Sequence, residues 1–213
     1  MFAAARGEAV YTPRMGKAVD SLAPGLLLAS PPLGDPNFDR TVVLLALHGD
    51  GGALGFVINR AAPLLVGELL SAVGHPEAAA DVSPVLLGGP VQRQSGWILS
   101  VEPDLEPGVL GVVGVGERLR VLSSQEAFEA LARDIAERAP GEGDPKQRTV
   151  LLGYSGWGPG QLESEIARGA WIPAPLDERV VLSVELGERW EHAYGTLGLS
   201  PAFGLSMRSV GDA

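Results

Sequence analysis

The chain has 213 residues, no cysteine, a hydrophobic fraction of 46% and a formal net charge of −10, with a pI of about 4.7. The lack of cysteine excludes disulfides, thiolate zinc sites and thiol nucleophiles. An acidic chain without a run of Lys and Arg disfavours direct nucleic-acid binding, which needs a basic face. No run approaches the roughly 20 apolar residues that span a bilayer, and residues 1–20 lack a secretion-signal pattern. These features predict a soluble cytoplasmic protein.

The first half of the chain is predicted to be rich in strands. Apolar, β-branched runs are typical of buried strands, and Asp50-Gly51 between two such runs indicates a hairpin. The prolines of residues 31–39 predict a loop, and helical spacing predicts a helix over residues 64–73. Strands are expected at residues 26–30, 41–48, 53–59, 84–91 and 96–102.

The second half alternates strands and helices. Ser123 with Glu126 three residues later indicates a capping box, and Pro159 suits the first position of a helix. Residues 141–147 are expected to form an exposed loop whose flanking strands share one sheet. The sequence therefore predicts one mixed α/β domain over residues 21–213, after a flexible arm at residues 1–20. Strands are expected at residues 109–113, 118–123, 148–155 and 179–185, and helices at residues 124–138, 159–168 and 188–198.

Several blocks of the chain resemble the YqgE/AlgH family of bacterial proteins. They read LLLASPPLGDPNFDRTVVLLALHGDGGALGFVINR, LLGGPVQRQSGWIL and LGYSGWGPGQLESEIARGAW. The match runs over residues 25–199, with departures at Ala61, where the family often has proline, and at Ser100, where it often has histidine. The resemblance implies a mixed α+β domain whose bifurcated β-sheet folds into a pseudo-barrel with flanking helices. It implies no settled activity and no known catalytic residue, and some members carry a transcriptional-regulator label.

Ser155 lies between a predicted strand and a predicted helix, where some hydrolases place their nucleophile. Gly153 fits the nucleophile elbow, but Trp157 stands where the second glycine should allow close backbone approach. Ser155, Asp177 and His192 follow one another in hydrolase order, yet chain order does not establish triad geometry. We therefore favour a helix-entry turn in which Trp157 fills the core, with a catalytic Ser155 as the alternative.

Two further motifs suggest ligands only superficially. Asp35 and Asn37 begin like a calcium loop, but Arg40 stands at the required glycine and Ala46 at the required glutamate. We expect Asp35 and Asn37 to bond nearby backbone N–H groups instead. The GDGGALG segment leads into a strand rather than a helix, so it is a hairpin and not a phosphate loop. No metal and no cofactor is predicted.

His48 ends a predicted core strand. The other histidines, His75 and His192, have no spacing suited to a zinc site. His48 is therefore expected to be a hydrogen-bonded structural residue, or else a titratable group in a cleft.

Arg40, Asn59 and Arg60 flank two strands that are expected to pair. Antiparallel pairing through the tight turn should bring them to the same end of the ladder. With Asp35 and Asn37 nearby, the two guanidinium groups could bind a carboxylate or phosphate. An Arg–Asp pair that fixes the loop to the sheet is the favoured interpretation of these residues, because structural ion pairs also occupy such sites.

Gln161, Glu165 and Arg168 share one face of a predicted helix. Such a stripe is typical of a solvated surface, but Trp157 and Trp171 at its ends could bound a groove or a partner surface.

Together these features favour a non-enzymatic regulatory or binding protein. Its partner would be a small ligand or a protein, bound near the group Asp35, Asn37, Arg40, His48, Asn59, Arg60, Trp157, Gln161 and Glu165. A hydrolase that uses Ser155 or a His48-centred site is the alternative, and an assembly module acting through the Trp171 region is another. The sequence leaves the oligomeric state open.

Overall fold

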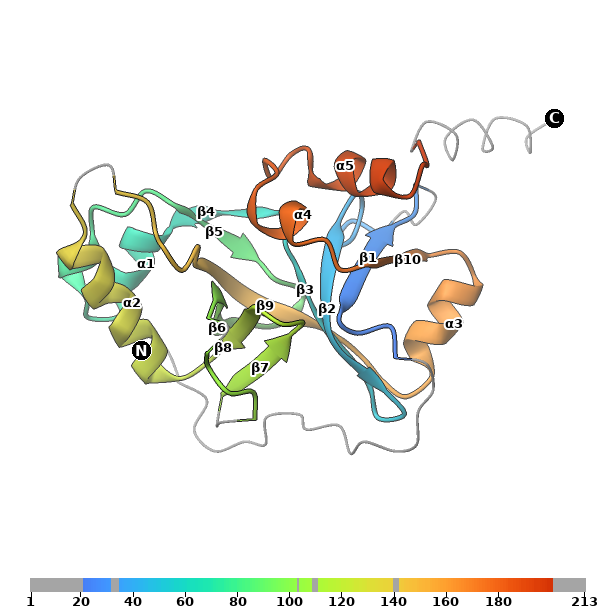
Figure 1. Ribbon diagram of the computed structural model, residues 1–213, viewed down its shortest axis with the longest axis horizontal. Coiled ribbons are helices and arrows are strands. Elements are labelled where there is room, and N and C mark those ends of the chain that lie inside the picture. Colours follow the sequence, from blue (N-terminus) through green and yellow to red (C-terminus); the bar gives the residue numbers. More distant parts are fainter. Residues whose placement is uncertain (1–20, 32–34, 103, 109–110, 140–141, 201–213) are drawn as a thin grey trace. The chain divides into compact units, whose positions relative to one another are not determined.

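The structure is a computed structural model that describes residues 21–31, 35–102, 104–108, 111–139 and 142–200 (Figure 1). The chain forms two compact units. Unit 1 holds the described residues of Ala61–Tyr154, and unit 2 holds those of Pro13–Arg60 and Ser155–Ala213. The predicted arm at residues 1–20 and the tail after residue 200 lie outside the described residues.

Unit 2 is built on antiparallel strands in the order β10-β1-β2-β3-β9, to which β9 contributes its last three residues. The predicted hairpin at Asp50-Gly51 is confirmed, because it joins β2 to β3. The strands are β1 (Gly25–Ala29), β2 (Val42–Gly49), β3 (Gly52–Val57), β9 (Thr149–Trp157) and β10 (Trp171–Pro175).

Both faces of the central strands of unit 2 are buried. Alternate residues of β1 point to opposite faces, and all five are buried. Leu27 and Ala29 join a core cluster with Trp157, Leu162 and Trp171. The unit also contains the helices α3 (Gln161–Ala167), α4 (Glu178–Leu182) and α5 (Arg189–Thr196), of which α5 lies against β1 and β2 (Figure 1).

Unit 1 has strands in the order β4-β5-β9-β6-β8-β7, and β5 and β9 run parallel. Its apolar core packs α1 and α2 against the sheet. The elements are β4 (Ala61–Leu65), α1 (Val66–Ala72), the 3₁₀ turn η1 (Pro76–Ala78), β5 (Pro84–Leu87), β6 (Val91–Val101), β7 (Val112–Val115), β8 (Leu119–Leu122) and α2 (Gln125–Glu137).

Strand β9 carries the branch point of the sheet. Its first residues pair with β5 on one side and β6 on the other, and its last three pair with β3. The sheet is therefore mixed and bifurcated, and with five α-helices in the described residues the expected α+β class is confirmed. Within those residues no helix is both long and apolar enough to cross a bilayer.

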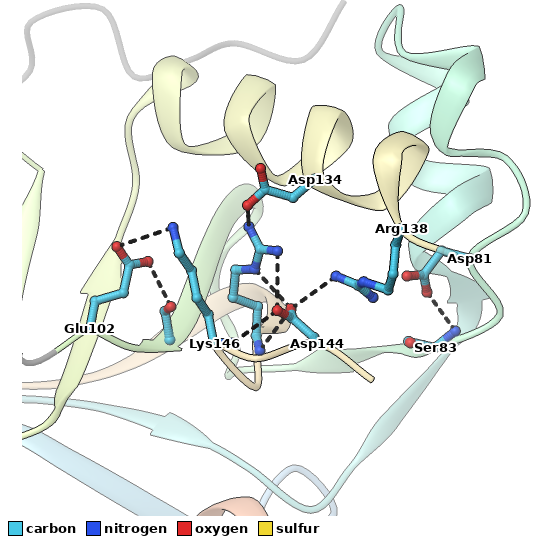
Figure 2. Close-up of polar contacts among 9 residues, drawn as sticks. Asp81, Ser83, Glu102, Asp134, Arg138, Asp144 and Lys146 are labelled. Carbon is cyan, nitrogen blue, oxygen red and sulfur yellow. Dashed lines mark hydrogen bonds and ion pairs between the residues drawn. The ribbon is translucent and has the colours of Figure 1, made fainter. Parts of the chain in front are cut away.

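Residues 142–147 of unit 1 form the expected loop, in which Glu142, Gly143, Pro145 and Gln147 are exposed, and an ion-pair network around the buried side chain of Arg148 anchors it (Figure 2). The Arg148 side chain is 4% exposed and donates to both carboxylate oxygens of Asp144 and to Asp134. Asp144 also accepts the backbone N–H groups of Lys146 and Arg148, and Arg138 lies 3.5 Å from it. Burial would raise the pKa of Asp144, but the hydrogen bonds from Arg148 and the Lys146 amide hold it below its ordinary value of 3.8.

Three sequence predictions were wrong. Strands β4 and β10 were missed, and both contain proline, which argues against a strand unless the strand lies at an edge. The segment at residues 179–185 was predicted to be a strand, but its first four residues belong to helix α4. Asp177 caps this helix by accepting the N–H of Arg179, and buried Val180 and Val181 satisfy the apolar pattern in helical form.

Two helix starts and the length of β9 also differ. Ser124, not Ser123, caps α2, and its hydroxyl accepts the N–H of Ala127. Helix α3 begins after Gly160 rather than at Pro159. Strand β9 continues to Trp157, two residues beyond the predicted end.

The outer edge of β10 is blocked by proline. The N–H of Ser30 donates to the carbonyl of Ala170, and alternate residues of an antiparallel ladder face the partner strand. Residues 171, 173 and 175 therefore turn their amide positions away from β1. Two of them are Pro173 and Pro175, which have no N–H to offer another strand.

Replacing both prolines should expose a template for strand pairing. We expect the double variant Pro173→Val, Pro175→Val to self-associate with increasing concentration, since valine restores the N–H and favours strands. Sedimentation velocity would measure this, with Pro76→Val in η1 as the matched control. Identical sedimentation of the wild type and the double variant over the same concentration range would show that the prolines do not protect this edge.

Candidate functional site

The sequence-predicted residues at the end of the β2–β3 ladder do meet in unit 2. Arg60 donates from Nη1 to the carbonyl oxygens of Pro36 (2.9 Å) and Asn37 (2.8 Å). Its Nη2 donates to the carbonyl of Asp39 at 3.0 Å. Arg60 thus holds the backbone of residues 36–40, here called the 36–40 loop.

Asp35 closes the start of this loop on itself. Its Oδ1 accepts the backbone N–H of Asn37 at 2.8 Å and the Asn37 side-chain amide at 3.1 Å. The carbonyl of Asp35 accepts the N–H groups of Phe38 and Asp39. This is the local backbone bonding that the sequence favoured over calcium binding. In the described part of the chain, no three His, Asp or Glu side chains are grouped so that they could hold a metal ion.

Asn59 fixes the other end of the 36–40 loop. Its Oδ1 accepts the N–H of Val42 at 2.9 Å, and its Nδ2 donates to the carbonyl of Arg40 at 2.9 Å. Arg40 has a φ of 52°, in the left-handed region that residues with a Cβ rarely adopt. Asn59 therefore holds a strained residue in place.

The side chain of Arg40 lies against α5. Its Nη2 is 2.7 Å from Oε1 of Glu191, and its guanidinium carbon lies 4.9 Å from the ring centre of Trp190. The side chain is 57% exposed. The guanidinium groups of Arg40 and Arg60 therefore have separate partners, and Arg40 is the more exposed of the two.

His48 is enclosed, with 2% of its side chain exposed. Its Nδ1 accepts the N–H of Leu22 at 3.1 Å, so the ring proton is on Nε2, which lies 3.1 Å from Oε1 of Glu163. Both ring nitrogens are used, and His48 joins the start of β1 to helix α3.

Glu165 is the centre of a polar cluster between α3 and the ends of β9 and β10. Its Oε2 accepts the indole N–H groups of Trp157 and Trp171, each at 2.8 Å, and its Oε1 accepts the Gln161 amide at 2.9 Å. The two indole rings meet edge to face, and Phe38 packs on Trp171 in the same way. Trp157 and Trp171 are 5% and 3% exposed, so they fill the core instead of lining an open groove.

Ser155 lies within strand β9, not in a turn. It pairs with Gly55 and is 1% exposed. The fold itself requires glycine at position 153. A Cβ there would lie 2.7 Å from the carbonyl oxygen of Gly89, and the φ of the residue is 72°. Asp177 caps α4 and His192 is an exposed residue of α5. An enclosed hydroxyl in a paired strand gives no access to a substrate.

Sequence reasoning missed Arg189, which is 7% exposed at the first turn of α5. Its Nε donates to the carbonyl of Val184 at 2.9 Å and its Nη1 to that of Ile58. Burial lowers the pKa of Arg189 to about 10, which the charge of Glu185 opposes. Burial likewise raises the pKa of Tyr194, on the same helix, to about 12. The signal that could have pointed to it is the triplet Glu188-Arg189-Trp190, near the end of the residues that resemble the family.

A sequence profile of the AlgH-like family matches residues 26–202. The chain belongs to the AlgH-like family. The UPF0301 protein of Anaeromyxobacter sp. (strain Fw109-5) is 46% identical over 191 residues, covering 86% of this chain and 92% of that protein. The UPF0301 protein of Myxococcus xanthus (strain DK1622) is 40% identical, covering 89% and 98%. All the candidate residues above lie within the matched range.

Two solved structures resemble the chain. The solution structure of the AlgH protein from Pseudomonas aeruginosa has a TM-score of 0.68 at 31% identity, covering 89% of this chain and 96% of that one. The crystal structure of protein DIP2367 from Corynebacterium diphtheriae has a TM-score of 0.58 at 21% identity, covering 84% and 87%, and shows the fold alone. The names of these relatives and of these two structures state no reaction, ligand or partner.

Proposed function

We propose that this AlgH-like chain is a non-enzymatic binding protein of the cytoplasm with a regulatory role, and that it engages a protein partner through the 36–40 loop. The observation that carries this is a loop that is both exposed and rigidly held. Pro36, Asn37, Asp39 and Arg40 are exposed, while Arg60 binds three of the loop's carbonyl groups. A loop ordered before binding loses less conformational entropy when the partner arrives.

Strain in the same loop supports a binding role. A residue with a Cβ at positive φ costs on the order of 1 kcal/mol, and such strain is concentrated at ligand-binding and switch regions. Arg40 carries this strain at φ 52°, and Asn59 maintains it. The side chain of Arg40 remains exposed beside Trp190, which suits a contact residue.

The geometry gives the hydrolase alternative little support. Ser155 is 1% exposed. His48 could act as a base only by giving up the N–H of Leu22, because its free lone pair is already used.

A protein partner is also favoured over nucleic acid, since the chain carries a net charge of −10. The alternative assembly surface at Trp171 would require that buried side chain to leave Glu165.

The test places a photo-crosslinking amino acid at Asp39, whose exposed side chain lies in the loop, in cells of the native host. We expect one defined protein adduct from position 39. The same amino acid at Arg179, an exposed residue of α4, is the control and should not give that adduct. Adding Arg60→Met should free the loop carbonyls and reduce the adduct about tenfold, a loss of roughly 1.4 kcal/mol.

The loop would be rejected as the binding surface if positions 39 and 179 gave equal amounts of the adduct, or if Arg60→Met did not change the amount formed at position 39. Tight, salt-dependent binding of duplex DNA in a shift assay would show that the partner is a nucleic acid and not a protein. Labelling of Ser155 by a serine-directed activity probe would favour the hydrolase instead.

A further inference from the structure

Arg189 is a buried cation whose direct partners are neutral. Its side chain ends at the carbonyl groups of Val184 and Ile58. Within the described residues no carboxylate comes within 4.0 Å of its guanidinium, and Glu185 acts on it only through its charge. Buried charges in proteins are usually paired with an opposite charge, because isolation from water is costly.

One end of this guanidinium is still available. Nε and Nη1 are used by the two carbonyls, whereas Nη2 has no hydrogen bond to any described residue. Nη2 also keeps contact with solvent, since it is not one of the fully enclosed polar atoms. Arg189 is 7% exposed and therefore holds one donor, fixed in direction, that no described residue accepts and that is not fully enclosed.

Charged residues of both signs lie near Arg189 in the chain or on its helix. The carbonyl that holds Nη1 belongs to Ile58, which directly precedes Asn59 and Arg60. Trp190, the residue after Arg189, carries the guanidinium of Arg40 on its ring. The acidic residues on the same segment are Glu185, Glu188 and Glu191, of which Glu191 is engaged by Arg40.

We propose that Nη2 of Arg189 binds an oxyanion, either a carboxylate or a phosphate group, which completes the charge balance of the buried guanidinium. Arginine is suited to this role because its planar group stays charged and its carbonyl-bound atoms fix the direction of the remaining donor. The lowered pKa of Arg189 agrees with a cation that lacks a direct counter-charge. The site does not depend on the 36–40 loop binding a protein.

The first test measures thermal unfolding at constant ionic strength while chloride is replaced by inorganic phosphate or by acetate. We expect the Tm of the wild type to rise by about 3 °C near saturation, because an anion that binds only the folded state stabilises it. Arg189→Met should lose this rise. Arg179→Met, which removes an exposed arginine from the neighbouring helix α4, should keep it. A rise that persists in Arg189→Met, or no rise in the wild type with either anion, would overturn the site.

A second test uses the wild type alone, in case Arg189→Met does not fold. The backbone amides of Asn59 and Glu185 share peptide bonds with the two carbonyls that hold Arg189. Their NMR signals should shift saturably with phosphate, with acetate or with both, and the responding anion identifies the chemistry of the group. Saturable shifts elsewhere while these two signals stay fixed would place the anion at another site and reject the proposal.

Discussion

Arg148→Met is expected to lower the free energy of unfolding by about 3 kcal/mol, because it removes the buried arginine from an ion-pair network with Asp134 and Asp144. Arg148 is 4% exposed and is the only side chain in the described residues that bonds both Asp134 and Asp144. Methionine keeps the length and apolar stem of the side chain but removes both guanidinium hydrogen bonds to the Asp144 carboxylate, which keeps its backbone donors. Urea unfolding followed by circular dichroism would measure the change.

Arg133→Met is the matched control, since Arg133 is an exposed arginine on helix α2 of the same unit. Loss of an exposed arginine should change stability by no more than about 0.5 kcal/mol. A similar loss for both variants would mean that general charge, not the network around Asp144, stabilises residues 142–148.

Acid provides an independent check on the same network. The pKa of Asp144 is lowered in the folded state, so the folded state holds its carboxylate ionised at pH values where the unfolded chain binds a proton. The stabilisation is therefore complete above the ordinary pKa of 3.8 and is lost as the pH falls below it. The difference in stability between wild type and Arg148→Met should narrow from about pH 4 to about pH 2. A constant difference over this range would contradict a role for ionised Asp144.

The sequence predicted the buried strands far better than the edge strands. An apolar, β-branched run such as that of β2 is typical of a strand buried on both faces, so its sequence predicts a central strand directly. The proline-containing strands β4 and β10 have only one neighbour each, so their sequences need not look like central strands. The apolar segment at residues 179–185 was ambiguous for a different reason, since a short buried run fits a strand or a helix equally well and only the Asp177 cap decides between them.

The proximity of Arg40, Asn59 and Arg60 was predictable from the sequence, but their hydrogen bonds were not. Antiparallel pairing after a tight hairpin was enough to place Arg40, Asn59 and Arg60 together. Sequence alone could not show that Arg60 would bind main-chain carbonyls rather than Asp35, because loop carbonyls have no sequence signature. Arg189 was missed because an arginine in a polar helix pattern looks exposed, and its burial depends on α5 packing against strands far away in the chain.

Trp157→Ala is expected to cost about 4 kcal/mol in the free energy of unfolding, which is typical of removing a buried aromatic side chain. Trp157 is 5% exposed, packs edge to face on Trp171 and donates to Glu165. The variant would leave a cavity in the core of unit 2 and remove one of three donors to the Glu165 carboxylate. Chemical unfolding monitored by the fluorescence of the remaining tryptophans would measure the loss.

Trp157→Phe separates packing from hydrogen bonding. Phenylalanine keeps most of the apolar contact but has no indole N–H, so it should cost about 1–2 kcal/mol. If alanine and phenylalanine cost the same, the hydrogen bond to Glu165, and not the filling of the core, would explain the tryptophan.

Trp157→Gly tests the hydrolase interpretation directly, since it restores the glycine two residues after Ser155 that a nucleophile elbow requires. We expect no esterase activity from this variant. The obstacle lies in the backbone and not in the indole alone, because Ser155 pairs with Gly55 inside a strand and is 1% exposed. Gly153, which completes the motif, is required by the close approach of the Gly89 carbonyl. Ester hydrolysis that appears in Trp157→Gly and disappears in Trp157→Gly, Ser155→Ala would show that the strand opens and that the serine can react.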